Sequence, residues 1–223
     1  MLEELCAALA EASERPGTRA VLLRGAGNSF TSGFDLAESL DLEASLRQGD
    51  LLVKAQLLLA EMDKVCIAVA HGYALAGGGA LIAACDYAVA SEDAKFGYPV
   101  LKVGIVPTPG MPFLRHELKD RDFRELVLGG EIWDASRAAQ AGLVNKVVPT
   151  LEDAIAEAHR FAGLVVAGSP VAVAATKAYA NSLSRKALRA ELEEALTMFE
   201  QVRRGDEAAE GLRAFSEKRP PLW

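Results

Sequence analysis

The sequence predicts an α/β protein, with an α/β core over residues 1–150 and a helical region over residues 151–223. In the core, short apolar runs typical of buried strands alternate with stretches of helical periodicity. The rest of the chain shows mainly the periodicity of amphipathic helices. With 223 residues, of which 51% are hydrophobic, the chain can bury a sizeable core without staples. This order of elements is typical of an α/β core with a helical extension.

Each element follows from its apolar period and from the turn residues beside it. Pro16-Gly17 ends the first helix, and the fully apolar run VCIAVA indicates a strand buried on both faces. Three consecutive glycines, Gly77 to Gly79, separate that strand from a short helix. In chain order we expect a helix over 2–14, a strand over 19–24, a loop over 25–33, a helix over 36–62 with a break near Gly49-Asp50, a strand over 65–70, a short helix over 80–84, a strand over 87–90, loops over 96–112, helical structure from Leu114, a strand over 142–148, and helices over 151–166, 170–183 and 185–203.

Composition and charge narrow the classes of function. The net charge of −7 and the pI of about 5.1 argue against a nucleic-acid surface. No apolar run is long enough to span a membrane, and Met1 leads directly into an amphipathic helix instead of a signal peptide. We therefore expect a cytoplasmic protein. Neither a disulfide framework nor a metal site is expected from its isolated cysteines and histidines, which are Cys6, Cys66, Cys85, His71, His116 and His159.

Common cofactor and nucleophile motifs are absent from the sequence. Gly25-Ala26-Gly27 follows a predicted strand, but Phe30 occupies the third glycine position of a dinucleotide loop. The glycine triple has no lysine after it, so it is not a P-loop, and no G-x-S-x-G motif occurs. We expect no cofactor.

Two glycine-containing loops, SFTSGFDL and ALAGGGA, each lead from a predicted strand into a predicted helix. Backbone N–H groups at a helix start lack intrahelical partners and lie at the positive end of the helix dipole. Two such loops side by side can direct two N–H groups at one oxygen, which suits a thioester carbonyl that becomes an enolate. Tight packing of strand against helix explains the glycines equally well, and spacing alone leaves both explanations open.

Four stretches resemble the crotonase superfamily, also called the enoyl-CoA hydratase/isomerase family. They are VLLRGAGNSFTSGFDLAE, HGYALAGGGALIAACDYAVASEDAKFGYPVLKVGIVP, WDASRAAQAGLVNKVVP and FSEKRPPLW. The resemblance implies a crotonase-like spiral of β-β-α turns with a C-terminal helical trimerisation region. It also implies an acyl-CoA thioester as partner, with coenzyme A as part of the substrate, and a homotrimer or a dimer of trimers.

The resemblance also assigns roles to single residues. The oxyanion-hole N–H groups fall on Phe34 and Gly77, Asp86 matches a structural acidic position, and a C-terminal tail segment can reach CoA. The substrate-binding set it implies comprises Ser32, Gly33, Asp35, Leu36, Gly78, Ala80, Tyr98, Val100, Thr108, Phe215 and Lys218.

The chain departs from the family where the family carries its acids. Ala80 and Val100 occupy the positions of the two hydratase glutamates, and Pro107 and Thr108 occupy positions where other members carry an aspartate. Hydration needs one group to activate water and another to protonate carbon. The chain also begins inside the first family helix, so we expect the N-terminal strands, and basic residues that often bind CoA phosphates there, to be missing.

Three functions remain open from the sequence. Decarboxylation of a malonyl-type thioester needs only an oxyanion hole and a proton source, for which Tyr98, Thr108, His71 or water are candidates. A hydratase or isomerase would need acids from elsewhere, with Glu61, Asp63 and Glu131 as candidates. The third is a non-catalytic acyl-CoA-binding or scaffold member.

Overall fold

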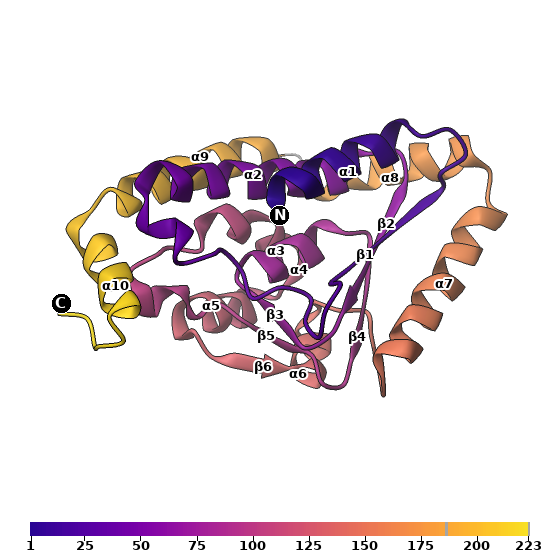
Figure 1. Cartoon of the computed structure of the whole chain (residues 1–223). Helices are drawn as coiled ribbons and strands as arrows, with labels where there is room; N and C mark the ends of the chain where they lie inside the picture. The colour runs from indigo at the N-terminus through magenta and orange to yellow at the C-terminus, as the bar shows by residue number, and fades with distance from the viewer. Residues whose placement is uncertain (186, 223) are drawn as a thin grey trace.

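The structure of the protein is a computed structural model that describes residues 1–185 and 187–222 (Figure 1). Its strands are β1 (Ala20–Arg24), β2 (Val65–Ala70), β3 (Tyr73–Leu75), β4 (Tyr87–Ser91), β5 (Lys95–Gly97), β6 (Ile132–Asp134) and β7 (Lys146–Val148). Its α-helices are α1 (Leu2–Glu14), α2 (Leu42–Glu61), α3 (Gly77–Ala84), α4 (Met111–Glu117), α5 (Asp120–Gly129), α6 (Ala135–Ala141), α7 (Leu151–Ala167), α8 (Pro170–Ser184), α9 (Leu188–Arg203) and α10 (Asp206–Ser216). Three short 3-10 helices are η1 (Glu38–Leu40), η2 (Pro99–Val103) and η3 (Thr108–Gly110).

The strands form two sheets that the chain visits in alternation. One sheet has the order β1-β2-β4-β7, with every neighbouring pair parallel. The other has the order β3-β5-β6, and Thr31 extends it through a parallel bridge to Ala74. Each turn thus adds one strand or bridge to each of the two sheets and then continues into a helix. The first turn consists of β1, Thr31 and α2, and the second consists of β2, β3 and α3. This confirms the predicted α/β fold and its β-β-α turns.

The structure corrects three details of the sequence prediction. The expected break near Gly49-Asp50 is wrong, because α2 runs unbroken from Leu42 to Glu61. Gly49 is there for packing, since a Cβ at that position would lie 2.9 Å from the Phe199 ring. The glycine triple belongs to α3 instead of preceding it. The short strands β3 and β5 overlap expected loops, and β6 lies where the sequence predicts helical structure, because three residues are too few to produce a recognisable alternation.

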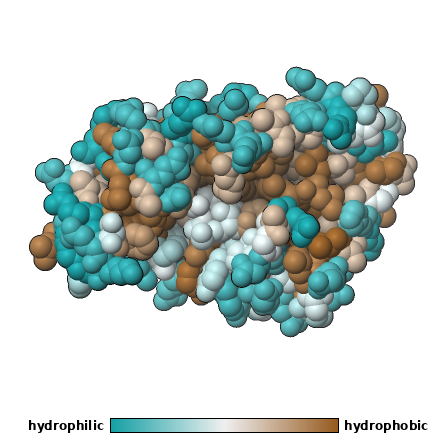
Figure 2. Space-filling view, in the orientation of Figure 1, coloured by the Kyte–Doolittle hydropathy of each residue, from teal (hydrophilic) through white to brown (hydrophobic). Residues whose placement is uncertain are grey.

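The C-terminal helices differ in how they pack. Helix α7 covers one face of the parallel sheet, where Ala154 and Ala158 meet the buried side chains of Val65, Ile67 and Val89. Apolar surface remains visible over β1, between α1 and α7 (Figure 2). No single helix in the described part of the chain passes a test for membrane spanning, although α7 and Pro170–Leu183 pass together as a pair bent by 110°.

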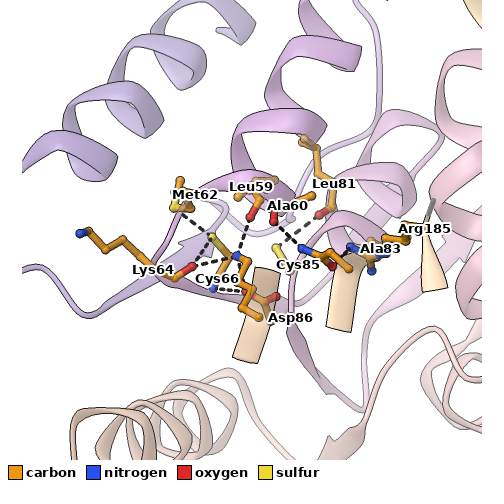
Figure 3. Close-up of polar contacts among 12 residues, drawn as sticks. Leu59, Ala60, Met62, Lys64, Cys66, Leu81, Ala83, Cys85, Asp86 and Arg185 are labelled. Carbon is orange, nitrogen blue, oxygen red and sulfur yellow. Dashed lines mark hydrogen bonds and ion pairs between the residues drawn. The ribbon is translucent and has the colours of Figure 1, made fainter. Parts of the chain in front are cut away.

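Helix α8 is fixed to the core by a buried lysine. The Lys177 ammonium donates to Asp86 Oδ2 at 2.7 Å and to the carbonyls of Leu59 and Lys64 at 2.9 and 2.8 Å. Asp86 also accepts the Cys66 N–H at 2.7 Å, as Figure 3 shows. Burial raises the pKa of Cys66 to about 12, so this thiol stays protonated. Asp86 therefore has the structural environment that the sequence suggested.

Replacing Lys177 with methionine should cost about 3 kcal/mol of unfolding free energy, because it leaves Asp86 and two carbonyls without their buried partner. Urea unfolding of the single variants K177M and D86N and of the double variant K177M/D86N measures this. The double variant should lose less than the sum of the two single losses, since the lone charge is gone. A loss below about 1 kcal/mol in K177M would contradict a buried anchor.

Candidate active site

The two glycine-containing loops lie side by side. Thr31 donates its N–H to the Tyr73 carbonyl at 2.9 Å and accepts the Leu75 N–H at 2.9 Å, so the chain leaves both strands in the same direction. Gly33 has a φ of +102°, and a Cβ on it would lie 3.1 Å from the Ala76 Cβ. Only glycine combines this backbone with such a close approach. The segments that enter α2 and α3 are therefore in contact just before Phe34 and Gly77.

The N–H groups of Phe34 and Gly77 have no hydrogen-bond acceptor among the described residues. Gly77 is the first residue of α3, where an unpaired N–H carries the positive end of the helix dipole. Its neighbour Ala76 has a φ of 48°, a conformation that alanine rarely adopts. Backbone strain of this kind is concentrated at functional sites, where the surrounding structure maintains it.

The three glycines of α3 have different surroundings. A Cβ on Gly78 would lie 2.9 Å from the Thr31 methyl, and one on Gly79 would lie 2.9 Å from the Tyr98 hydroxyl, so both are required for packing. A Cβ on Gly77 would meet Leu52 at 3.4 Å, which is ordinary contact. Packing therefore does not require glycine at the one position of the three that lines the cavity and offers a free N–H.

Phe34 and Gly77 both line a cavity of about 1140 Å³. The predicted site residues that line it are Ser32, Gly33, Phe34, Asp35, Leu36, Gly77, Tyr98, Val100 and Phe215. Gly78, Ala80, Thr108 and Lys218 do not line it. Thr108 instead donates its hydroxyl to the Ala195 carbonyl of α9 at 2.8 Å.

The inner wall of the cavity is closed by Tyr98. Its side chain is buried, and its hydroxyl has no hydrogen-bond partner within the described residues. A Cβ on Gly110 would lie 3.3 Å from this hydroxyl and 2.8 Å from the Ala80 Cβ, so Tyr98, Ala80 and Gly110 pack tightly together. Burial raises the pKa of Tyr98 far above its ordinary value. Tyr98 is therefore a neutral phenol at physiological pH.

The carboxylates that line the cavity, within the described residues, are Glu3, Asp35 and Glu38, and each has a partner. Glu3 pairs with Arg47. Asp35 accepts the N–H groups of Ala37 and Glu38 at 2.9 and 3.2 Å, and Glu38 accepts the Gln48 amide at 2.9 Å. Each carboxylate at the cavity is therefore already held by an ion pair or by hydrogen bonds.

The other proton donors and acids considered from the sequence lie elsewhere. Glu61 pairs with Arg189, and Asp63 with Lys64 at 2.9 Å. Glu131 is exposed outside the cavity lining. His71 is buried, and its Nε2 bonds to the Gly27 carbonyl at 3.0 Å. No group of three potential metal ligands occurs in the described part of the chain.

Sequence reasoning missed the basic residues of the cavity, which are Arg47, Lys102 and Arg219. Arg47 pairs with Glu3, and Arg219 pairs with Glu210 at 2.6 Å. Lys102 is exposed and has no carboxylate partner among residues 1–185 and 187–222. These residues come from α2, η2 and the C-terminal tail, so no local motif could have joined them.

Comparisons with known proteins cover the whole chain. A family model described as "Enoyl-CoA hydratase/isomerase" matches residues 1–223. The chain is 34% identical to a mevalonyl-coenzyme A hydratase of Aspergillus fumigatus, over 94% of this chain and 79% of that protein. It is 32% identical to a carnitinyl-CoA dehydratase of Citrobacter koseri, over 93% and 82%. The crystal structure of an enoyl-CoA hydratase/isomerase from Xanthobacter autotrophicus Py2 superposes with a TM-score of 0.88 at 31% identity, over 97% of this chain and 83% of that one.

Proposed function

The chain belongs to the enoyl-CoA hydratase/isomerase family, with the crotonase-like fold that its sequence predicts, and from this premise we propose that it binds an acyl-CoA thioester in the cavity. The N–H groups of Phe34 and Gly77 hold the thioester oxygen and stabilise an enolate. The observation that carries the proposal is the pair of unpartnered N–H groups on two adjoining loops at the cavity. Donors fixed before the reaction stabilise developing charge at little reorganisation cost.

We favour decarboxylation of a malonyl-type thioester over hydration. The bond between the α-carbon and the carboxylate breaks, and its electron pair forms the enolate as CO2 leaves. The negative charge on the thioester oxygen then faces Phe34 and Gly77. A proton from solvent returns to the α-carbon, because burial makes the Tyr98 hydroxyl a weaker acid than an ordinary phenol. No step needs a protein carboxylate, which agrees with Ala80 and Val100 at the glutamate positions and with the engaged carboxylates of the cavity.

The alternative is a non-catalytic acyl-CoA-binding member, favoured by the same shortage of free acids in the cavity. Incubation with crotonyl-CoA and methylmalonyl-CoA, followed by mass spectrometry, separates the functions. We expect a loss of CO2 from methylmalonyl-CoA and no hydration of crotonyl-CoA. Binding of both thioesters without turnover would favour the binding member, and hydrated crotonyl-CoA would overturn the decarboxylase proposal.

Lys102 is proposed to attract the CoA phosphates, because it is the lining cation without a described carboxylate partner. Charge reversal in the variant Lys102→Glu should raise the dissociation constant for butyryl-CoA by about tenfold at low salt. The difference should shrink at high salt, where such interactions are screened. Lys54→Glu makes the same charge change on α2 outside the cavity lining. Equal losses in both variants would indicate a general charge effect instead of a phosphate site.

We also propose self-association into a homotrimer through the last helices. Exposed apolar side chains on α7 and α8 support it, namely Leu164, Val166, Val171, Tyr179 and Leu183. Exposed apolar side chains gathered on the helices of a subunit are typical of interaction sites. Light scattering at several concentrations tests the proposal, and a monomer throughout would contradict it.

A further inference from the structure

Arg203, near the C-terminal end of α9, is a buried charge with neutral hydrogen-bond partners. The residue is only 5% exposed. Its Nε donates to the Ser45 hydroxyl at 2.9 Å, and an Nη donates to the Ser39 carbonyl. No carboxylate of the described residues forms an ion pair with it. Burial lowers the pKa of Arg203, although Asp41 offsets part of this. Burying a cation without a contacting anion is costly, so the position calls for an explanation.

The residues that Arg203 holds lead directly to Phe34. Ser39 belongs to η1, and its N–H donates to the Asp35 carbonyl at 2.9 Å. The Ser39 hydroxyl also lies within hydrogen-bond distance of that carbonyl, at 2.8 Å. The Asp35 carbonyl belongs to the peptide unit between Asp35 and Leu36, so the guanidinium is linked through one buried serine to a peptide two units after the one that carries the proposed Phe34 donor.

Phe199 supports the same loop from one helical turn earlier. Residues four apart share a face of a helix, so Phe199 and Arg203 both point from α9 toward the core. The Phe199 ring is 1% exposed and meets the Phe34 ring edge-on, with centroids 6.3 Å apart and planes at 75°. The Phe34 ring in turn lies near Gly77, since a Cβ there would be 3.9 Å from Phe34 Cε1. Glycine at position 49 leaves the space that Phe199 occupies.

We propose that Phe199 and Arg203 are positioning residues for the Phe34 amide. Phe199 fixes the side chain of Phe34, and Arg203 fixes the turn that follows it. The inference rests on the proposed oxyanion hole at Phe34 and Gly77. Neither residue lines the main cavity, so neither touches the ligand there. Substituting either residue should therefore weaken the binding of the ligand's carbonyl oxygen and leave the contacts with the rest of the ligand unchanged.

The test compares two ligands that differ only at that oxygen. Butyryl-CoA has the thioester carbonyl, and S-butyl-CoA has a methylene in its place. Calorimetry gives both dissociation constants for the wild type and for the variants Phe199→Leu, Arg203→Met and Arg203→Lys. Arg204→Gln is the matched control, because it removes the neighbouring guanidinium, which pairs with Glu200 at 2.8 Å. Circular dichroism establishes that each variant is folded, and Phe199→Leu decides the test if Arg203→Met fails to fold.

In the wild type, butyryl-CoA should bind about tenfold more tightly than S-butyl-CoA. Phe199→Leu and Arg203→Met should remove most of that preference while the S-butyl-CoA constant stays within a factor of about two. Arg203→Lys should keep part of the preference, and Arg204→Gln should keep all of it. An unchanged preference in folded variants, or equal losses for both ligands, would overturn the positioning role. A wild type without any preference would overturn the oxyanion hole itself, and the inference with it.

Discussion

The variant Gly77→Ala should fold as well as the wild type and lose at least about 100-fold in kcat/KM for methylmalonyl-CoA. Its added Cβ makes only ordinary contact with Leu52, at 3.4 Å, so the core does not oppose it. Alanine also has a higher helix propensity than glycine, and the change in unfolding free energy should stay within about 1 kcal/mol. The methyl group lies between Leu52 and Phe34, beside the free N–H group. The ligand oxygen can then no longer approach closely.

Two further glycine variants serve as controls for Gly77→Ala. In Gly163→Ala, a Cβ in α7 meets nothing within 4 Å, so stability should rise slightly and activity should not change. In Gly79→Ala, the Cβ would lie 2.9 Å from the Tyr98 hydroxyl, and overpacking should cost about 1–3 kcal/mol. Urea unfolding and steady-state kinetics on the three proteins separate packing from function. A Gly77→Ala protein with wild-type kinetics would contradict the proposed oxyanion hole. The kinetic comparison requires a wild type that turns over methylmalonyl-CoA. If the wild type only binds, the butyryl-CoA dissociation constant replaces kcat/KM.

The sequence was sufficient to locate the two loops because their information is local. A fully apolar run such as VCIAVA indicates a strand buried on both faces, and the glycines after it mark a change of backbone direction. The sequence could not separate the roles of Gly77, Gly78 and Gly79. Their difference depends on Thr31 and Tyr98, which reach α3 from other parts of the chain.

The predictions that required tertiary contacts were the ones that local patterns could not make. Thr108 was a candidate proton donor because the resemblance places it where other members carry an aspartate, whereas the structure shows its hydroxyl bonded to α9. Gly49 suggested a helix break, yet it accommodates Phe199, which lies 150 residues later in the chain. Arg203 ends the helix predicted over 185–203, and only the fold shows that it is buried against Ser39 and Ser45. The roles of such residues can be inferred from their tertiary contacts and not from their neighbours in sequence.

The variant Ala80→Glu should be severely destabilised, by about 4 kcal/mol or more. Ala80 is fully buried, and it packs closely against Gly110. A Cβ added to Gly110 would lie 2.8 Å from the Ala80 Cβ. A glutamate would need space that the Tyr98 ring occupies, and its carboxylate would be buried without a cation beside it. Urea unfolding or the thermal midpoint measures the loss. Val100→Glu is the comparison, because Val100 is only half-buried and lines the cavity, so its carboxylate can reach solvent. That variant should lose no more than about 1–2 kcal/mol.

A contrast between these two variants would bear directly on the reaction. Hydration requires two acids. Of the two positions that the resemblance assigns to the hydratase glutamates, we expect only Val100 to have room for one. Removing the ring in Tyr98→Ala should therefore reduce the cost of Ala80→Glu, so that the double variant loses less than the sum of the single losses. If Ala80→Glu alone melted within a few degrees of the wild type, the inner wall would be open, and Tyr98 would not be the residue that closes it. If the contrast holds, neither Ala80→Glu nor Val100→Glu alone is expected to give hydration, because Tyr98 and Gly110 occupy the space beside Ala80, the position that the resemblance assigns to the first glutamate. That outcome would favour the proposed enolate formed by loss of CO2 over hydration.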